Sequence, residues 1–205
     1  MNKPTFYEQV GIIIPGSVLV FGLVLFYPDL RILTTKDAFS VGELGLFVLI
    51  AYAAGHLVAA IANALESLFW GALGGMPSNW VVRDPPSLLS TEQVENLRGK
   101  VGTRLNITIA KMAGFDRKKW WPISRQIYAD VGKNGKTERI DTFNGNYGLN
   151  RGLASACLVL TVVALAHAYW LIAAGLFLAA CIYGYRAYRF GVHYARELYL
   201  QFLVL

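Results

Sequence analysis

The chain has 205 residues, of which 55% are hydrophobic and only 16% are charged. A soluble domain carries about 25% charged residues, so this composition excludes an ordinary soluble globular protein. The charges are also unevenly distributed, because residues 10–28 and 152–185 contain no Asp, Glu, Lys or Arg. Uncharged stretches of this length are typical of membrane-spanning helices.

The first predicted span covers residues 10–27 and contains Pro15 followed by Gly16. About 18 residues, each rising about 1.5 Å, are just long enough to cross the apolar core of a bilayer. The proline predicts a kink or break, which serves either as a gating hinge or as a way to fit the helix into a bundle. Because no small-residue cleavage motif follows, we interpret the stretch as a retained helix.

The second predicted span covers residues 44–65 and is rich in Ala and Gly, which favours close helix packing in lipid. Its polar residues His56 and Asn63, with Glu66 just beyond them, are spaced by seven and three residues and so share a helix face. A polar face inside a membrane needs water or a protein partner. The pattern therefore predicts either a pore lining or gate, or a His–Asn contact that holds helices together.

A predominantly polar insert, residues 66–151, follows the second span. Ser90 and Gln93 have the spacing of a capping box, which predicts a helix through Arg98. Pro122 is expected to start a second helix, because proline is favoured at the first helical position. A third helix is expected to run on into the third span.

The uncharged stretch 152–185 is too long for one membrane crossing. It predicts a tight hairpin of two spans that turns at about residues 166–168. Tyr169 and Trp170 are then aromatic anchors at the far interface.

The predicted fold is an all-α membrane protein with four transmembrane helices and a small helical cytoplasmic insert between the second and third. Orientation follows from the excess of Lys and Arg in cytoplasmic loops. The loop 28–43 has two basic and three acidic residues, whereas the insert has thirteen basic and eight acidic ones. We therefore expect the insert and both termini on the cytoplasmic side of a bacterial inner membrane. The predicted parts are an N-terminal transmembrane pair (1–65), a basic insert (66–151), a transmembrane hairpin (152–185) and a cytoplasmic C-terminal helix (186–205).

Motifs for catalysis or metal binding are missing from the sequence. It has no phosphate-binding Gly-Lys-Ser/Thr loop, no His-Glu-x-x-His and no Cys pair at zinc spacing, and its three histidines lie in separate segments. We therefore expect neither an enzyme nor a protein with a metal or cofactor.

Two basic clusters with aromatic neighbours are candidates for ligand binding. The first lies in the insert, where cations and tryptophans alternate in a way that suits phosphates and stacked bases, or equally an anchor on anionic lipid. The second lies in the C-terminal segment, where three arginines share one helix face with His193. The predicted ligand-binding residues are Arg117, Lys118, Lys119, Trp120, Trp121, Arg125, Arg186, Arg189 and Arg196.

A stripe of four residues precedes the third span. Arg139, Phe143, Tyr147 and Arg151 recur every four positions and so lie on one side of the expected helix. They indicate either packing of the insert on the C-terminal segment, with Arg151 snorkelling to the interface, or coupling between the insert and the span. The apolar end, residues 198–205, is expected to be buried against the insert or another subunit.

Two short motifs carry a resemblance to known proteins. The runs Phe6–Gly16 (FYEQVGIIIPG) and Arg139–Arg151 (RIDTFNGNYGLNR) resemble small four-span membrane proteins from bacterial anti-phage defence operons. The general plan resembles the membrane effector of the Hailong type. That resemblance implies an oligomeric ion channel controlled by single-stranded oligodeoxyadenylate, with a signal-producing nucleotidyltransferase as a partner. We take a tetramer as the working assumption for the homo-oligomer.

The sequence favours a homo-oligomeric channel effector whose basic cytoplasmic face binds a polyanion, either a nucleotide or single-stranded nucleic acid. The alternative is a membrane anchor or scaffold that recruits a cytosolic partner without conducting ions. An intramembrane enzyme comes third, because no catalytic constellation is present. Ion flux in liposomes distinguishes the first two.

Overall fold

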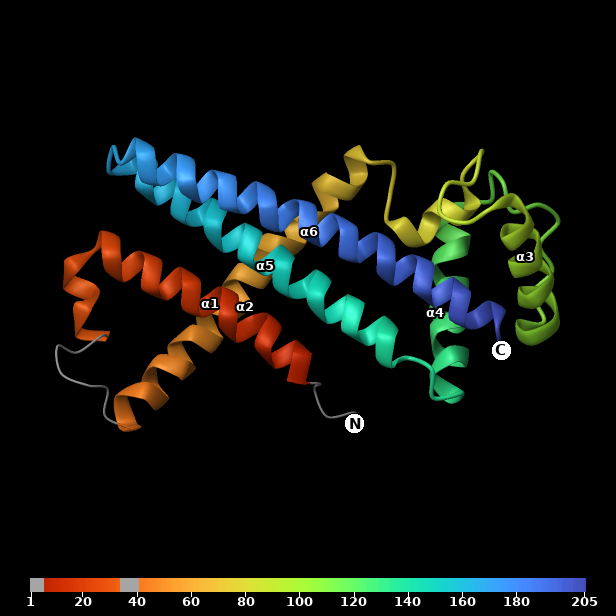
Figure 1. Cartoon of the computed structure of the whole chain (residues 1–205), viewed down its shortest axis with the longest axis horizontal. Coiled ribbons are helices and arrows are strands. Elements are labelled where there is room, and N and C mark those ends of the chain that lie inside the picture. Colours follow the sequence, from red (N-terminus) through yellow and green to blue (C-terminus); the bar gives the residue numbers. More distant parts are fainter. Residues whose placement is uncertain (1–5, 34–40) are drawn as a thin grey trace. The chain divides into compact units, whose positions relative to one another are not determined.

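A computed structural model describes residues 6–33 and 41–205 of the chain. Its elements, in chain order, are α1 (Phe6–Phe26), the 3-10 helix η1 (Pro28–Leu33), α2 (Val41–Ala72), the 3-10 helix η2 (Pro77–Val82), α3 (Thr91–Leu105), α4 (Arg117–Lys133), α5 (Glu138–Ala166) and α6 (Trp170–Leu203) (Figure 1). Within the described residues, α2, α5 and α6 are long and apolar enough to cross a membrane, and α1 contributes a shorter apolar helix. The chain is therefore an all-helical protein with the helix composition of a membrane protein.

The fold consists of two compact units, and three helices run from one unit into the other. Unit 1 holds the described residues up to Leu68 together with Gly145–Tyr188. Unit 2 holds Phe69–Asn144 together with Arg189–Leu205. Unit 1 thus contains the apolar parts of the long helices, and unit 2 contains the insert with the C-terminal part of α6.

Close helix packing in unit 1 depends on glycines, as the small residues of the second span predicted. A side chain at Gly16 of α1 would collide with the backbone carbonyl of Ala51 in α2. Conversely, a side chain at Gly55 of α2 would collide with the carbonyl of Ile12 in α1. The two backbones approach each other closely because neither glycine has a Cβ atom.

Helix α1 continues through Pro15, so the break considered from the sequence does not occur. The proline ring packs against α5, where a Cβ atom on Gly152 would lie 2.7 Å from Pro15 Cγ. Tight packing of a neighbouring helix is one way in which a membrane helix accommodates proline. Further along, Leu19, Val58 and Leu160 form part of a buried apolar cluster.

The hairpin between α5 and α6 confirms the predicted turn. Helix α5 ends at Ala166, Ala168 adopts a left-handed conformation with φ of 59°, and α6 begins at Trp170. The two helices then run alongside each other (Figure 1). About halfway along both helices, Arg186 Nε donates to Asn150 Oδ1 at 3.1 Å.

Helix α3 begins at the predicted capping box. The Ser90 hydroxyl accepts a hydrogen bond from the Gln93 N–H at 3.2 Å, and the Gln93 side chain accepts one from the Ser90 N–H at 3.1 Å. The helix extends to Leu105, beyond the predicted end at Arg98. Arg98 remains inside the helix and pairs with Glu95 at 2.8 Å.

Helix α4 begins at Arg117, five residues before the predicted start at Pro122. The side chain of Asp116 caps the new start by accepting a hydrogen bond from the Lys118 N–H at 2.8 Å. Pro122 therefore lies inside the helix, and because proline has no backbone N–H it cannot donate a hydrogen bond to the carbonyl four residues earlier. That carbonyl belongs to Lys118, an exposed residue, so water can satisfy it.

Trp120 is the centre of the core of unit 2. It is fully buried, and its indole N–H is shared between the Ser78 carbonyl at 2.8 Å and the Tyr199 hydroxyl at 3.0 Å. The Tyr199 hydroxyl donates in turn to the Ser78 carbonyl at 2.6 Å. Burial raises the pKa of Tyr199, which keeps this donor protonated. The neighbouring Phe202 is also fully buried, so the apolar end of the chain packs within unit 2.

Candidate functional site

The polar residues of α2 point outward from unit 1. His56 and Asn63 are exposed, and Tyr52 and Ser67, which continue the same face by helical spacing, are exposed too. The His56 ring packs edge-on against Tyr52, with ring centroids 4.6 Å apart. On the other side of the helix, Val58 is fully buried. A single chain therefore leaves the polar face of a membrane-type helix uncovered.

Glu66 does not belong to this outward face. Its side chain is only 17% exposed, and it forms an ion pair with Arg151 of α5. The Tyr147 hydroxyl donates a hydrogen bond to Glu66 Oε1 at 2.7 Å. Glu66 is thus turned away from His56 and Asn63, and it pairs with Arg151, which lies 85 positions away in the sequence.

The other two residues of the predicted α5 stripe contact the C-terminal part of α6. Arg139 pairs with Glu197 at 3.5 Å, and its guanidinium lies 5.6 Å from the centroid of the Phe143 ring. Phe143 in turn stacks on His193, with ring centroids 5.5 Å apart. One helix therefore contacts α2 through Tyr147 and Arg151 and contacts the end of α6 through Arg139 and Phe143.

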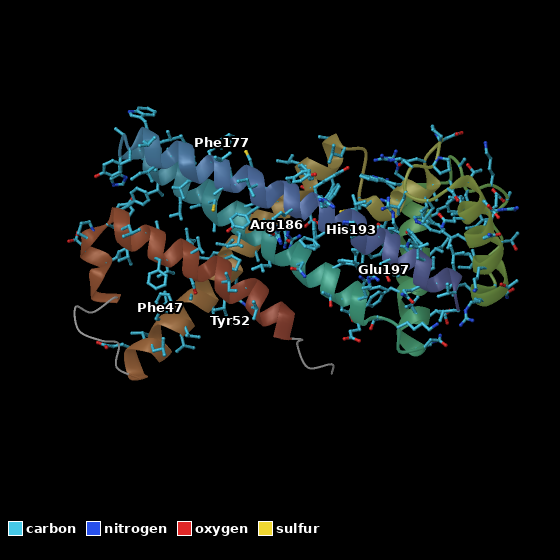
Figure 2. All side chains as sticks on the ribbon, in the orientation of Figure 1. Phe47, Tyr52, Phe177, Arg186, His193 and Glu197 are labelled. Atoms are coloured by element: carbon cyan, nitrogen blue, oxygen red, sulfur yellow. The ribbon has the colours of Figure 1, made fainter. Side chains whose placement is uncertain are left out.

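Arginines from two helices surround His193, and we call Arg139, Arg189, His193 and Arg196 the basic cluster. Burial and the positive charges of Arg189, Arg196 and Arg139 hold the pKa of His193 below its ordinary value of 6.5. His193 lies beyond the uncharged part of α6, and Figure 2 shows it between Arg186 and Glu197 along that helix. All three arginines of the cluster are exposed, so their charges are open to a ligand.

The sequence did not assign Arg139 to a ligand site, because it lies about 50 residues before Arg189. The spacing along α5 identified it only as a coupling residue. Its position next to His193 follows from the packing of α5 on α6, which no local pattern encodes. Arg186, which the sequence grouped with the other tail arginines, belongs to unit 1 and bonds to Asn150.

The first basic motif separates into buried and exposed residues. Trp120 is inaccessible to a stacked base because it is fully buried, whereas Trp121 is 59% exposed. Lys118, Lys119 and Arg125 are exposed as well, and the Arg125 guanidinium lies 5.9 Å from the centroid of the Trp121 ring. Any stacking role predicted for the motif can therefore fall only to Trp121.

Arg117 forms a hydrogen bond to the backbone just beyond the end of α2. Its Nη1 donates to the Gly74 carbonyl at 2.7 Å, and Arg83 donates to the adjacent Leu73 carbonyl. Cations at these carbonyls complement the negative end of the helix dipole. Both arginines also line a cavity of about 440 Å³ together with Asp84, Ser87 and Phe115. The sequence did not predict this cavity, whose walls come from segments about 30 residues apart.

The chain was compared with protein-family models, with curated proteins and with solved structures. None of these comparisons finds a match.

Proposed function

We propose that the chain is the subunit of a homo-oligomeric membrane channel in which the outward face of α2 lines the water-filled path. The observation that carries this proposal is the exposure of His56 and Asn63 on a helix apolar enough to span a membrane. Exposure of such groups to lipid is costly, so they require water or a second subunit. Copies of the chain arranged around an axis would supply a neighbouring subunit and a water-filled path for these groups. We take a tetramer as the working assumption.

The proposed topology has four spans, with α1 as the fourth crossing next to α2, α5 and α6. Both termini and unit 2 then lie in the cytoplasm of a bacterium, on the side favoured by the Lys and Arg excess. The uncharged α5–α6 turn lies outside, where no charge has to be translocated.

The proposed regulator is a polyanion bound by the basic cluster. Arg139 of the basic cluster is a residue of α5, and it pairs with Glu197. Further along α5, Tyr147 and Arg151 bind Glu66 of α2. A ligand that displaces Glu197 from Arg139 would therefore act on a helix that contacts the pore-lining helix directly. The two motifs that resemble anti-phage membrane effectors support a nucleotide signal, single-stranded oligodeoxyadenylate, made by a partner nucleotidyltransferase.

Ion flux through liposomes that contain the purified chain tests the channel. In a variant with Cys157→Ala and Cys181→Ala, single cysteines replace Tyr52, His56, Asn63 or Ser67, and a water-soluble thiol reagent is added. We expect the reagent to block flux at these positions. At Leu57, which is 67% exposed but lies off the polar face, the same substitution should leave flux unblocked. No flux at all, or equal block at Leu57, contradicts the proposal and leaves a non-conducting anchor or scaffold.

Binding of single-stranded oligodeoxyadenylate to detergent-purified protein tests the regulator. Affinity should fall steeply with salt, with a slope of about 0.7 for each phosphate neutralised. Arg189→Ala/Arg196→Ala should lower both affinity and slope, whereas the charge-matched control Lys133→Ala/Lys136→Ala should not. Equal binding by all three proteins rules out the basic cluster as the ligand site.

A further inference from the structure

Four of the five large exposed apolar side chains of unit 2 lie in two segments. In the described part of this unit, the large apolar side chains that are exposed are Phe69, Leu73, Met76, Trp121 and Val204. Phe69, Leu73 and Met76 continue the apolar surface of α2 past Glu66, Trp121 lies in the first turns of α4, and Val204 follows the end of α6. An exposed apolar surface of this kind marks contact with a protein or a membrane.

Hydrogen bonds hold these two segments together. Arg117, the first residue of α4, donates to the Gly74 carbonyl at 2.7 Å, and Trp120 donates to the Ser78 carbonyl at 2.8 Å. The end of α2 is itself well defined: Gly74 and Gly75 are left-handed, and the Gly75 N–H bonds to the Trp70 carbonyl at 2.7 Å. The start of α4 is therefore fixed to the end of a membrane-type helix.

The exposed side of α4 has the composition of a membrane-surface helix. Lys118, Trp121 and Arg125 are spaced by three and four residues and so share one face, and all three are exposed. The opposite face, with Trp120, is buried in unit 2. From Arg117 to Ala129 the helix has four cations and no carboxylate.

We propose that this surface, formed by the end of α2 and the Lys118–Trp121–Arg125 face of α4, docks on the anionic phospholipid headgroups of the bilayer that α2 crosses. Trp121 occupies the interfacial layer, where the amphipathic indole ring is favoured. Lys118 and Arg125 bind headgroup phosphates, while Leu73 and Met76 rest on the acyl boundary. The contact would hold unit 2 against the membrane whether or not the chain conducts ions, so it is independent of the proposed channel.

Quenching of Trp121 fluorescence by brominated lipid tests this contact in the full-length chain. The contribution of Trp121 is the difference between the wild-type chain and Trp121→Phe, which removes the effect of the other tryptophans. We expect quenching of this difference signal in vesicles of brominated phosphatidylglycerol and much less in vesicles of brominated phosphatidylcholine. High salt should reduce it, because the attraction is partly electrostatic.

A pair of charge-matched variants distinguishes an effect of this face of α4 from an effect of the net charge. Each cation at an anionic surface is worth about a fivefold change in partitioning, so Lys118→Gln/Arg125→Gln should lower the docked population about 25-fold. Lys133→Gln/Lys136→Gln removes the same charge from exposed residues beyond this face and should leave quenching unchanged. Trp121 emission that is unquenched in both lipids overturns the proposal. Emission quenched by single-stranded DNA but not by brominated lipid overturns it too, and assigns the face to nucleic acid.

Discussion

Trp120 and Trp121 are neighbours in the sequence, but they have opposite roles. The indole of Trp120 is fully buried and bonded to Ser78 and Tyr199, whereas that of Trp121 is 59% exposed beside Arg125. Successive residues of an α-helix point about 100° apart, so one of the two faces the core while the other faces away. A motif that seems uniform in sequence is therefore divided by the helix that contains it.

Replacement of each tryptophan by phenylalanine should separate these roles. Trp120→Phe removes the N–H that Ser78 and Tyr199 accept in a buried site, and should cost about 1–3 kcal/mol. Trp121→Phe should change stability by no more than about 0.5 kcal/mol, as is usual for exposed sites. Melting followed by near-ultraviolet circular dichroism in detergent measures both. Equal losses in the two variants would argue against the central position of Trp120.

Binding of a polyanion should also depend on pH through His193. Because its pKa lies below 6.5 in the free protein, a polyanion that offsets the charges of Arg139, Arg189 and Arg196 should raise that pKa and cause proton uptake. Affinity should then increase as pH falls below about 6.5, by at most about tenfold per pH unit for one proton. Above that range the imidazole is neutral in both states, so the dependence disappears. A His193→Gln variant that retains the full pH dependence would contradict this assignment.

At the scale of elements, the contact between α1 and α2 depends on close approach of their backbones. Gly55→Ala places a methyl group against the Ile12 carbonyl and should separate the helices, at a cost of about 1–3 kcal/mol or more. Gly45→Ala is the matched control, because Gly45 is exposed on α2 with no other atoms nearby. Alanine is favoured over glycine in a helix by about 1 kcal/mol, so the control should keep or gain stability. Thermal unfolding in detergent compares them, and a loss in both variants would refute the crossing.

The ion pair between α2 and α5 allows a second test at this scale. Glu66→Gln or Arg151→Gln alone leaves a half-buried charge without its partner and should cost about 1–3 kcal/mol. The double variant should lose less than the sum of the single losses, because both charges are removed together. A coupling energy of zero in this double-mutant cycle would show that the contact contributes nothing to the packing of the two helices.

For the whole molecule, the proposed topology predicts which residues can be labelled from each side. In the chain without native cysteines, Ala168→Cys at the α5–α6 turn should react with an impermeant thiol reagent added to intact cells. Lys133→Cys at the end of α4 should react only after the cells are opened. Both residues are exposed, so a lack of reaction reports sidedness and not burial. External labelling of Lys133→Cys would overturn the orientation.

Much of the fold could be predicted because it depends on local chemistry. Apolar stretches of sufficient length produced the long helices, the stretch 152–185 produced the hairpin, and Ser90 with Gln93 produced the start of α3. These features need only neighbouring residues, since helix hydrogen bonds and caps join positions a few residues apart. Helix α4 starts five residues before Pro122 because the Asp116 side chain caps it there, and a proline is also tolerated inside the second turn of a helix whose freed carbonyl is exposed.

The candidate site depended on information that the sequence does not express locally. His56, Asn63 and Glu66 have the spacing of one face, but Tyr147 and Arg151 turn Glu66 away from the other two. A helical pattern gives relative angles around an axis, whereas the direction of each face is set by packing against distant segments. The sequence by itself determined which segments form apolar helices and where the cations lie along each helix. Only the tertiary structure decided which polar residues remain exposed, because their partners lie tens of residues away in the chain.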